Sequence, residues 1–273
     1  MSYTETHERV GFFTDTSVCI GCKACEVACK EWNLVPEDGL DWTGESYDNT
    51  SALGADTWRH VAFIEQTVDS TDALRWLMSS DVCKHCTHAA CLDVCPTGAL
   101  FRTEFGTVVV QEDVCNGCGY CVPACPFGVI DRREVPADDR PAPFEGKPDG
   151  RVWKCTLCYD RLKGGHTPAC AKACPTESIQ FGPLDELRDR AAARLEKLKD
   201  DGVDDARLYG EDPNDGVGGF GAFFLLLDEP EVYGLPPDPV VTTRDLPEMW
   251  RTAAVAAAAL VGAALLAVAG GSG

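Results

Sequence analysis

The chain has 273 residues, with 24 lysines and arginines against 44 aspartates and glutamates, so its formal net charge is −20 at pH 7. This charge excludes nucleic acid and anionic lipid surfaces as favourable partners, because both are negative themselves. The length allows one or two domains. Sixteen residues are cysteine, and they fall into four groups of four with none left over.

In chain order, the first group has the spacing C-x2-C-x2-C-x3-C, which the third group repeats. Bacterial ferredoxins use this spacing to bind one [4Fe–4S] cluster through three thiolates and to send the fourth thiolate to another cluster. Pro96, Pro126 and Pro175 follow the last three groups directly, as in ferredoxins, whereas Lys30 follows the first. We call the groups the first run (Cys19, Cys22, Cys25, Cys29), the second run (Cys83, Cys86, Cys91, Cys95), the third run (Cys115, Cys118, Cys121, Cys125) and the fourth run (Cys155, Cys158, Cys170, Cys174).

The spacing has a chemical reason. Iron–sulfur clusters select soft thiolate ligands that converge on them from several sides. Two residues between cysteines form a tight loop that turns successive thiols inward, and a C-x3-C step places the last cysteine about one helical turn further along. Four complete runs predict four [4Fe–4S] clusters and a protein that conducts electrons between them.

The segment between the second and third runs is typical of a β-hairpin, with a turn at Phe105-Gly106 and a β-branched strand over Thr107–Val110. Such a hairpin usually connects the two runs of one ferredoxin module, which predicts an inner module over 81–149. The first and fourth runs then form an outer module over 1–80 and 150–182. The predicted fold class is α+β: two ferredoxin-like two-cluster modules, one inserted in the other, with a C-terminal transmembrane helix.

The nested arrangement also predicts the iron ligands, because the fourth cysteine of each run binds the cluster of the partner run in two-cluster ferredoxins. No catalytic side chain stands out. We name each ligand set after the run that supplies three of its members: the first-run set (Cys19, Cys22, Cys25, Cys174), the second-run set (Cys83, Cys86, Cys91, Cys125), the third-run set (Cys115, Cys118, Cys121, Cys95) and the fourth-run set (Cys155, Cys158, Cys170, Cys29).

Three other interpretations of the cysteines compete. Zinc knuckles use two C-x2-C pairs, but they explain neither the third cysteine of C-x2-C-x2-C nor the prolines. Disulfides suit short secreted chains, whereas this chain is long and begins MSYTETHERV, without the basic and apolar regions of a signal peptide. A three-iron cluster would follow from the loss of one ligand, yet all four runs are complete.

The segment 183–228 is expected to pack on the modules as a helix and a strand. Pro183 begins an amphipathic helix that ends at Gly202, and Phe223–Leu227 reads as a buried strand. Residues 229–249 form an arm too rich in proline for a helix.

The last segment, 250–273, predicts a membrane anchor. Ala253–Ala269 contains no polar side chain, and a helix from Trp250 to Gly270 would be about 31 Å long, enough to cross the hydrocarbon core. Trp250 and Arg251 suit the membrane interface. The alternative, a buried helix of a soluble protein, would have a polar face, and this segment has none.

These residues together closely resemble the β (iron–sulfur) subunit of respiratory formate dehydrogenases, within the four-cluster ferredoxin-like subunit family of molybdopterin oxidoreductases. The resemblance runs from about Gly11 to Val240. It is carried by GFFTDTSVCIGCKACEVACKEWN at 11–33, DVCKHC at 81–86, RTEFGTVVV at 102–110, CNGCGYCVPACPFGVI at 115–130 and KCTLCYDR at 154–161.

The resemblance implies a non-catalytic subunit that relays electrons from a molybdenum or tungsten bis-pterin catalytic subunit, which oxidises formate, to an integral membrane subunit that reduces quinone (cytochrome b type or similar). It implies that electrons enter at the first-run cluster and leave at the fourth-run cluster near the membrane. The same electron wire serving a membrane hydrogenase or a sulfur or sulfoxide oxidoreductase is the alternative.

The sequence places the protein at the cell membrane and leaves the face of its globular part open. Arg244 and Arg251 precede the apolar segment and no basic residue follows it, which favours the cytoplasmic side by the positive-inside rule. The family resemblance points to the opposite side, with export on a catalytic partner that carries the signal.

Overall fold

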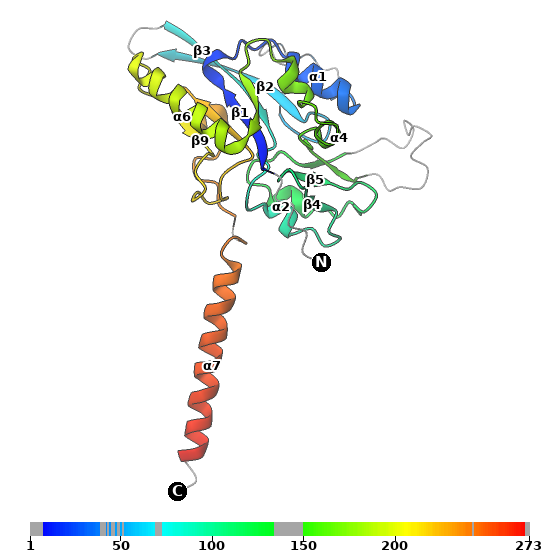
Figure 1. The fold of residues 1–273 in the computed structure, drawn as a ribbon. Helices are drawn as coiled ribbons and strands as arrows, with labels where there is room; N and C mark the ends of the chain where they lie inside the picture. The colour runs from blue at the N-terminus through cyan, green and yellow to red at the C-terminus, as the bar shows by residue number, and fades with distance from the viewer. Residues whose placement is uncertain are drawn as a thin grey trace.

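A computed structural model describes residues 8–38, 42, 44, 47, 50, 52–68, 73–133, 150–241 and 243–270. Residues 134–149 of the predicted inner module and 271–273 of the predicted anchor therefore lie outside the described residues. Figure 1 shows a folded body from which one long C-terminal helix, α7 (Leu246–Gly270), projects.

A four-stranded mixed sheet with the order β8–β1–β10–β9 lies at the centre of the body. β1 and β10 are parallel, with Phe13 opposite Phe223, and the other two pairs are antiparallel. The segment after the fourth run is thus part of the same sheet as the segment before the first run. The strands are β1 (Val10–Asp15), β8 (Ile179–Pro183), β9 (Arg207–Tyr209) and β10 (Ala222–Leu226).

The strand predicted at Phe223–Leu227 is confirmed, one residue earlier, as β10. All five of its residues are buried, as expected for an apolar run covered on both faces. The rings of Phe13 and Phe223 stack with centroids 5.3 Å apart. Each fully buried side chain of this size contributes roughly 1.5–3 kcal/mol to folding.

The predicted amphipathic helix is confirmed as α6 (Leu184–Asp200). It starts directly after Pro183, and Gly202 follows its end with a left-handed φ of 88°. Leu187 and Ala191 are completely buried on the face that packs on β1 and β8. The helix therefore closes one side of the central sheet and leaves its charged side to solvent.

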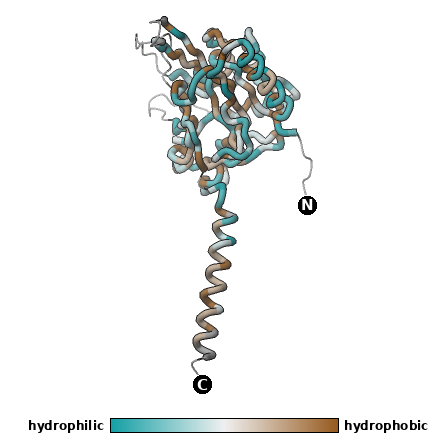
Figure 2. Tube along the Cα trace, turned by 90° about the vertical axis from the view of Figure 1, so that its left-hand side faces the viewer, coloured by the Kyte–Doolittle hydropathy of each residue, from teal (hydrophilic) through white to brown (hydrophobic). Residues whose placement is uncertain are grey.

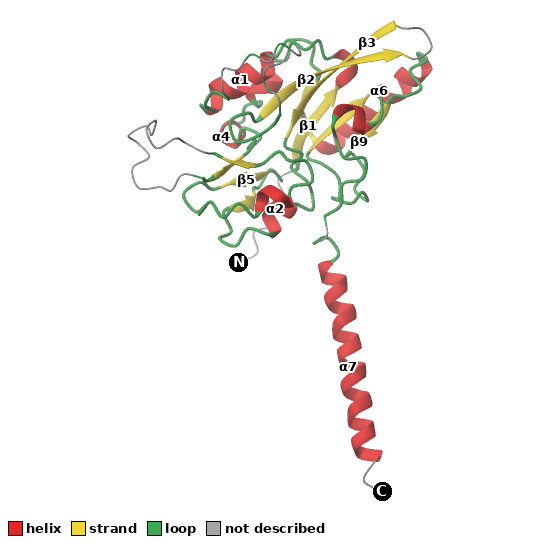
Figure 3. Ribbon diagram, turned by 180° about the vertical axis from the view of Figure 1, so that it is seen from behind, coloured by secondary structure: helices red, strands yellow, loops and turns green. Residues whose placement is uncertain are grey.

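A long hairpin of β2 (Arg59–Val68) and β3 (Ala73–Val82) was not expected from the sequence. Arg59 pairs with Val82 at the end that lies in the body, where Val61, Ser79 and Ser80 are buried. In the sequence, the hairpin lies between the first and second runs. Figures 1 and 3 show that it projects at the top of the body.

The runs themselves lie on short elements. The third cysteine of every run stands in a short helix, and the last cysteine lies a helical turn further along, which confirms the expected meaning of the C-x3-C step. The helices are α1 (Ala24–Asn33), α2 (Ala90–Asp93), α3 (Cys121–Ala124), α4 (Tyr159–Lys163) and α5 (Ala169–Ala173); the 3₁₀ turns are η1 (Thr16–Val18) and η3 (Pro230–Tyr233).

The hairpin predicted between the second and third runs is confirmed: β4 (Leu100–Arg102) pairs antiparallel with β5 (Val108–Val110). A second small hairpin joins β6 (Asp131–Arg132) to β7 (Val152–Trp153). Figure 3 shows α2 and β5 in the part of the body from which α7 leaves, with α1 and α4 further away.

α7 differs from the core helix of a soluble protein. Its 18-residue stretch Glu248–Leu265 is long and apolar enough to cross a membrane, and none of it is buried against the body. Figure 2 shows apolar colours along most of its length, with hydrophilic residues near its start. Length and composition make it one candidate span within the described residues.

Candidate iron–sulfur centres

All four runs share one unusual backbone feature. The residue directly before the second cysteine has a positive φ in every run: Gly21 (64°), His85 (45°), Gly117 (74°) and Leu157 (58°). A left-handed residue turns the loop so that neighbouring thiols and N–H groups face a common point. His85 and Leu157 adopt this conformation at a cost of roughly 1–2 kcal/mol each, because their Cβ atoms crowd the backbone. The shared turn indicates that all four loops are built for the same type of group.

The ends of the runs also repeat. After the C-P step of the second, third and fourth runs, a left-handed residue closes a turn: Gly98, Gly128 and Glu177, with φ of 68°, 62° and 53°. In each turn the backbone N–H of this residue donates to the carbonyl of the last cysteine, at 3.3–3.4 Å. The first run instead continues as helix α1 after Cys29, which is the structural consequence of its missing proline.

The four members of the first-run set line one cavity. Cys19, Cys22 and Cys25 come from the loop before α1 and its first turn, and Cys174 comes from the end of α5. Burial raises the pKa of the Cys19 thiol, and the thiols of Cys25 and Cys174 raise it further. Cysteines 155 residues apart in the chain therefore face the same space.

The four members of the second-run set line another cavity. Cys83, Cys86 and Cys91 come from one loop and α2, and Cys125 comes from the end of α3. The backbone also turns His85 into this lining, where its Nδ1 accepts a hydrogen bond from the N–H of Val108 at 3.1 Å. Burial and then the neighbouring thiols of this set raise the pKa of Cys86 well above its ordinary value.

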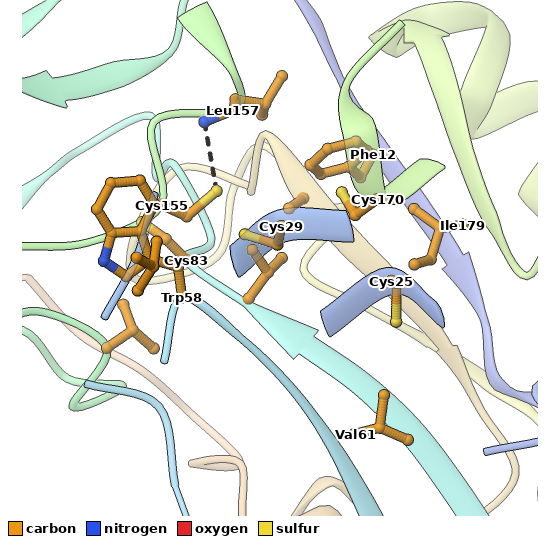
Figure 4. Close-up of a cluster of buried hydrophobic side chains, with 14 of the residues drawn as sticks. Phe12, Cys25, Cys29, Trp58, Val61, Cys83, Cys155, Leu157, Cys170 and Ile179 are labelled. Atoms are coloured by element: carbon orange, nitrogen blue, oxygen red, sulfur yellow. Dashed lines mark hydrogen bonds between the residues drawn. The ribbon is translucent and has the colours of Figure 1, made fainter. Parts of the chain in front are cut away.

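Three members of the fourth-run set, Cys29, Cys155 and Cys170, lie together in a buried apolar cluster, shown in Figure 4. The fourth, Cys158, lies with Cys29 beside the side-chain amide of Asn33. Burial and, after it, the thiols of Cys170 and Cys158 raise the pKa of Cys29 to about 12. The thiol of Cys155 accepts a hydrogen bond from the N–H of Leu157 at 3.3 Å. This bond runs across the left-handed turn, as expected of a loop that directs N–H groups toward thiolate sulfur.

The third-run set contains one buried cysteine, Cys121, and two half-buried ones, Cys95 and Cys115. Burial and, after it, the thiols of Cys115, Cys118 and Cys95 raise the pKa of Cys121 to about 12. Burial alone would also raise the pKa of Cys95, but backbone N–H groups led by that of Leu100 lower it overall. Cys118 is exposed to solvent. Among the described residues, no three His, Cys, Asp or Glu side chains are placed to hold a single metal ion.

Neighbouring cysteines of different sets indicate the order of the sets in space. Cys25 of the first-run set shares a buried cluster with Cys170 of the fourth-run set, which raises the pKa of Cys25 in addition to burial. The thiols of Cys29 and Cys83 raise the pKa of Cys155, after burial. Cys121 likewise contributes to the raised pKa of Cys91. The order is therefore first, fourth, second, third.

This order corrects one expectation from the sequence, which placed the fourth-run cluster last and next to the membrane. The arm before α7 runs beside the second run instead: Val241 lines the second-run cavity, and Thr243 donates a hydrogen bond to Asp93 of α2. α4 of the fourth run lies away from the side where α7 leaves (Figures 1 and 3). The expectation was wrong because β1 and β8 hold the ends of the first and fourth runs together, whereas the end of the arm that leads into α7 lies beside the second run.

Three cationic side chains are buried among the cysteines: Arg59, Lys84 and Lys154 are exposed by 2% or less. Lys84 forms an ion pair with Asp81 and lies over the rings of Phe127 and Phe224. Burial lowers the pKa of Arg59, but the thiolates around it, led by Cys170, raise it overall. Burial also lowers the pKa of Lys154, but the thiolates around it, of which Cys83 has the largest effect, raise it overall.

The residues fit [4Fe–4S] clusters on these observations. Two cavities each present four thiols, the loops present N–H groups to sulfur, and buried cations stand where the thiolates and clusters would place negative charge. The three buried cations were not expected from the sequence. Lys84 and Lys154 each adjoin a cysteine of a C-x2-C pair, which is the one sequence feature that marks them; Arg59 has none.

The fold and the cysteine-lined cavities define an iron–sulfur electron carrier of the dicluster ferredoxin class. Two family models, both described as a 4Fe–4S dicluster domain, match residues 18–99 and 74–184. The chain is 42% identical over 262 residues to the formate dehydrogenase iron–sulfur subunit of Haemophilus influenzae, covering 93% of this chain and 77% of that protein.

Two further relatives extend the comparison. The iron–sulfur subunit of nitrate-inducible formate dehydrogenase from Escherichia coli K12 is 41% identical, over 86% of this chain and 75% of its own length. A subunit of anaerobic dimethyl sulfoxide reductase from the same organism is 38% identical, over 67% of this chain and 77% of its own length. The chain belongs to the family of formate dehydrogenase iron–sulfur subunits, and it is an electron-transfer subunit that carries 4Fe–4S clusters.

Proposed function

We propose that the chain carries four [4Fe–4S] clusters, one in each of the four ligand sets, and that it relays electrons without catalysing a reaction itself. The observation that carries the proposal is that each of two cavities is lined by the three leading cysteines of one run and the last cysteine of another. A cluster bound there supplies one-electron storage and transfer.

The chain's own residues have three roles in this proposal. The sixteen thiolates hold the iron, and backbone N–H groups such as that of Leu157 donate to thiolate sulfur and stabilise its negative charge. Apolar side chains such as Phe12 and Trp58 exclude water from the first and fourth runs. The four sets extend in one row, which would bring electrons from the first-run end toward the second and third runs, beside the arm.

The domain organisation belongs to the same proposal. The outer module comprises 1–80 and 150–182, the inner module 81–149, and 183–228 adds α6, β9 and β10. The arm 229–249 then leads to a membrane anchor at 250–273. Contrary to the expectation of no helix in the arm, its last four residues, 246–249, form the first turn of α7. The position of Cys174 in the first-run cavity and of Cys125 in the second-run cavity supports this nested pairing over a sequential one, as does the pairing of β1 with β8.

We infer that the partners are a molybdenum or tungsten catalytic subunit that oxidises formate and an integral membrane subunit that reduces quinone. The relatives named formate dehydrogenase iron–sulfur subunits match 86–93% of this chain, whereas the dimethyl sulfoxide reductase subunit matches 67%. α7, exposed and apolar, supports a position at the cell membrane.

Purification of the tagged full-length chain from its native membranes tests the partner assignment. A co-purifying molybdopterin subunit, with clusters of this chain reduced upon addition of formate, is the expected result. A nickel–iron subunit and reduction by hydrogen would contradict it and favour a hydrogenase. A sulfoxide-reducing partner with no response to formate would contradict it as well.

A further inference from the structure

Arg59 is a buried cation without a carboxylate partner in the described part of the chain. Its Nη1 donates to the backbone carbonyl of Ser80 at 3.2 Å and to the Ser80 hydroxyl at 2.9 Å, and its guanidinium lies 5.0 Å from the ring centroid of Phe12. Its Nε and Nη2 find no hydrogen-bond partner among the described residues. Burial of such a charge is costly unless negative charge lies nearby.

The negative charge near Arg59 comes from cysteines of two ligand sets. The Ser80 hydroxyl that Arg59 contacts lies 3.2 Å from the Sγ of Cys25, which belongs to the first-run set. Phe12, whose ring Arg59 faces, shares a buried cluster with Cys29, Cys155 and Cys170 of the fourth-run set, and these three cysteines also act electrostatically on Arg59. Arg59 therefore stands at the junction between the first and fourth sets.

Lys154 occupies the equivalent place at the next junction. Its Nζ donates to the carbonyl of Cys155, at 3.0 Å, and to that of Val108, and its side chain lines the second-run cavity. No carboxylate in the described residues pairs with it, in contrast to Lys84, which is neutralised by Asp81. Lys154 thus lies between the fourth-run set and the second-run set.

We propose that Arg59 and Lys154 raise the reduction potential of the fourth-run cluster from its two sides. Arg59 also raises the potential of the first-run cluster, and Lys154 also raises that of the second-run cluster. The physical reason is that reduction adds an electron to a group that is already negative. An uncompensated cation in a poorly solvated interior stabilises that electron more strongly than it would in water. The inference rests on the proposed function, because it requires clusters in these sets.

The proposal predicts a pattern that needs no prior assignment of spectra. Removal of Arg59 lowers the potentials of the first-run and fourth-run clusters, and removal of Lys154 lowers those of the fourth-run and second-run clusters. One cluster therefore responds to both changes, two respond to one change each, and the third-run cluster responds to neither. A structural role alone would alter cluster occupancy without this pattern.

The experiment is a redox titration, followed by electron paramagnetic resonance, of the full chain with its clusters. The neutral variants are Arg59→Gln and Lys154→Met, the charge-retaining variant is Arg59→Lys, and the control is Arg75→Gln, on the same hairpin but paired with Asp228 at 3.0 Å. We expect the reduction equilibrium constant of the affected clusters to fall about tenfold, or about 59 mV for one electron.

The Arg59→Lys and Arg75→Gln variants should keep the potentials of the unmodified protein. Unchanged potentials in either neutral variant with full iron content would overturn the inference, as would a uniform shift of all four clusters. If Arg59→Gln fails to assemble, Arg59→Met replaces it and Lys154→Met remains an independent test. Absence of iron from the unmodified chain would instead overturn the proposed function, so the two failures are distinguishable.

Discussion

At the residue scale, the positions that follow the cysteines decide how each run ends. Gly98, Gly128 and Glu177 occupy the same left-handed position in three equivalent turns, and only the last of them has a side chain. A Cβ added to Gly98 or Gly128 would meet no atom within 4 Å, so these turns select glycine through backbone conformation alone. Glu177 is exposed and forms the one strained turn of the three.

This comparison predicts that Glu177→Gly stabilises the protein. Relief of the left-handed strain should raise the free energy of unfolding by about 1 kcal/mol, after allowance for the greater freedom of glycine in the unfolded chain. Gly98→Ala should lower it by a similar amount and serves as the matched control. Thermal unfolding of the cluster-loaded variants measures both; a loss of stability in Glu177→Gly would show that the turn is not strained.

The last cysteine of each run, which is proposed to bind the cluster of the partner run, gives a second prediction at this scale. Cys174→Ser should remove or degrade the same cluster as Cys22→Ser, because both thiols belong to the first-run set. Each variant should lose about a quarter of its iron or less, depending on whether a three-iron cluster survives. Loss in Cys174→Ser of the resonance that Cys118→Ser removes would support sequential pairing instead of nested pairing.

At the scale of elements, the sequence predicted what periodicity and turn chemistry can specify. The amphipathic stripe of α6, the apolar run of β10 and the turn at Phe105-Gly106 all have local causes, and all three are confirmed. The β2–β3 hairpin was missed because polar Arg59, Ser79 and Ser80 are buried at its inner end, which breaks the apolar alternation.

Buried charges were missed for a related reason. Sequence rules place arginine and lysine at the surface unless they are paired, and the partners of Arg59 and Lys154 are thiolates that are distant in sequence, except for Cys155 next to Lys154. The pairing of β1 with β10 joins residues more than 200 positions apart, and no local pattern specifies such a contact.

α7 gives the prediction that belongs to this scale. Ala258→Arg, near the middle of the apolar helix, should weaken membrane insertion by roughly 2.5–3.5 kcal/mol, whereas Ala258→Leu should leave it intact. Removal of 246–273 should release the chain from the membrane entirely. Fractionation of carbonate-washed membranes measures all three; equal retention of the truncated and complete chains would exclude α7 as an anchor.

At the scale of the whole molecule, charge is distributed unevenly between the interior and the surface. The chain has a net charge of −20, yet the three cations buried most completely lie among the thiols. Clusters in the four sets would add further negative charge to the interior, which the cations offset. The pairing of β1 with β8 brings the ends of the first and fourth runs together, and the second run lies beside the arm that leads to α7.

The spatial order of the sets predicts magnetic coupling between reduced clusters. The fourth-run cluster, which lies between two others, should show spin–spin interaction with both the first-run and the second-run clusters. Direct spin–spin interaction between the first-run and second-run clusters should be weaker than either of these, because the fourth run lies between them. Power-saturation measurements on Cys→Ser variants that lack one cluster each would reveal a different order.

The proposed function requires that all sixteen cysteines hold iron in four cubane clusters. Iron and acid-labile sulfide can be measured on the anaerobically purified chain. We expect about sixteen irons and about sixteen sulfides per chain. About four metal ions per chain without sulfide would contradict the proposed function, because that result would describe zinc or single-iron sites in place of clusters.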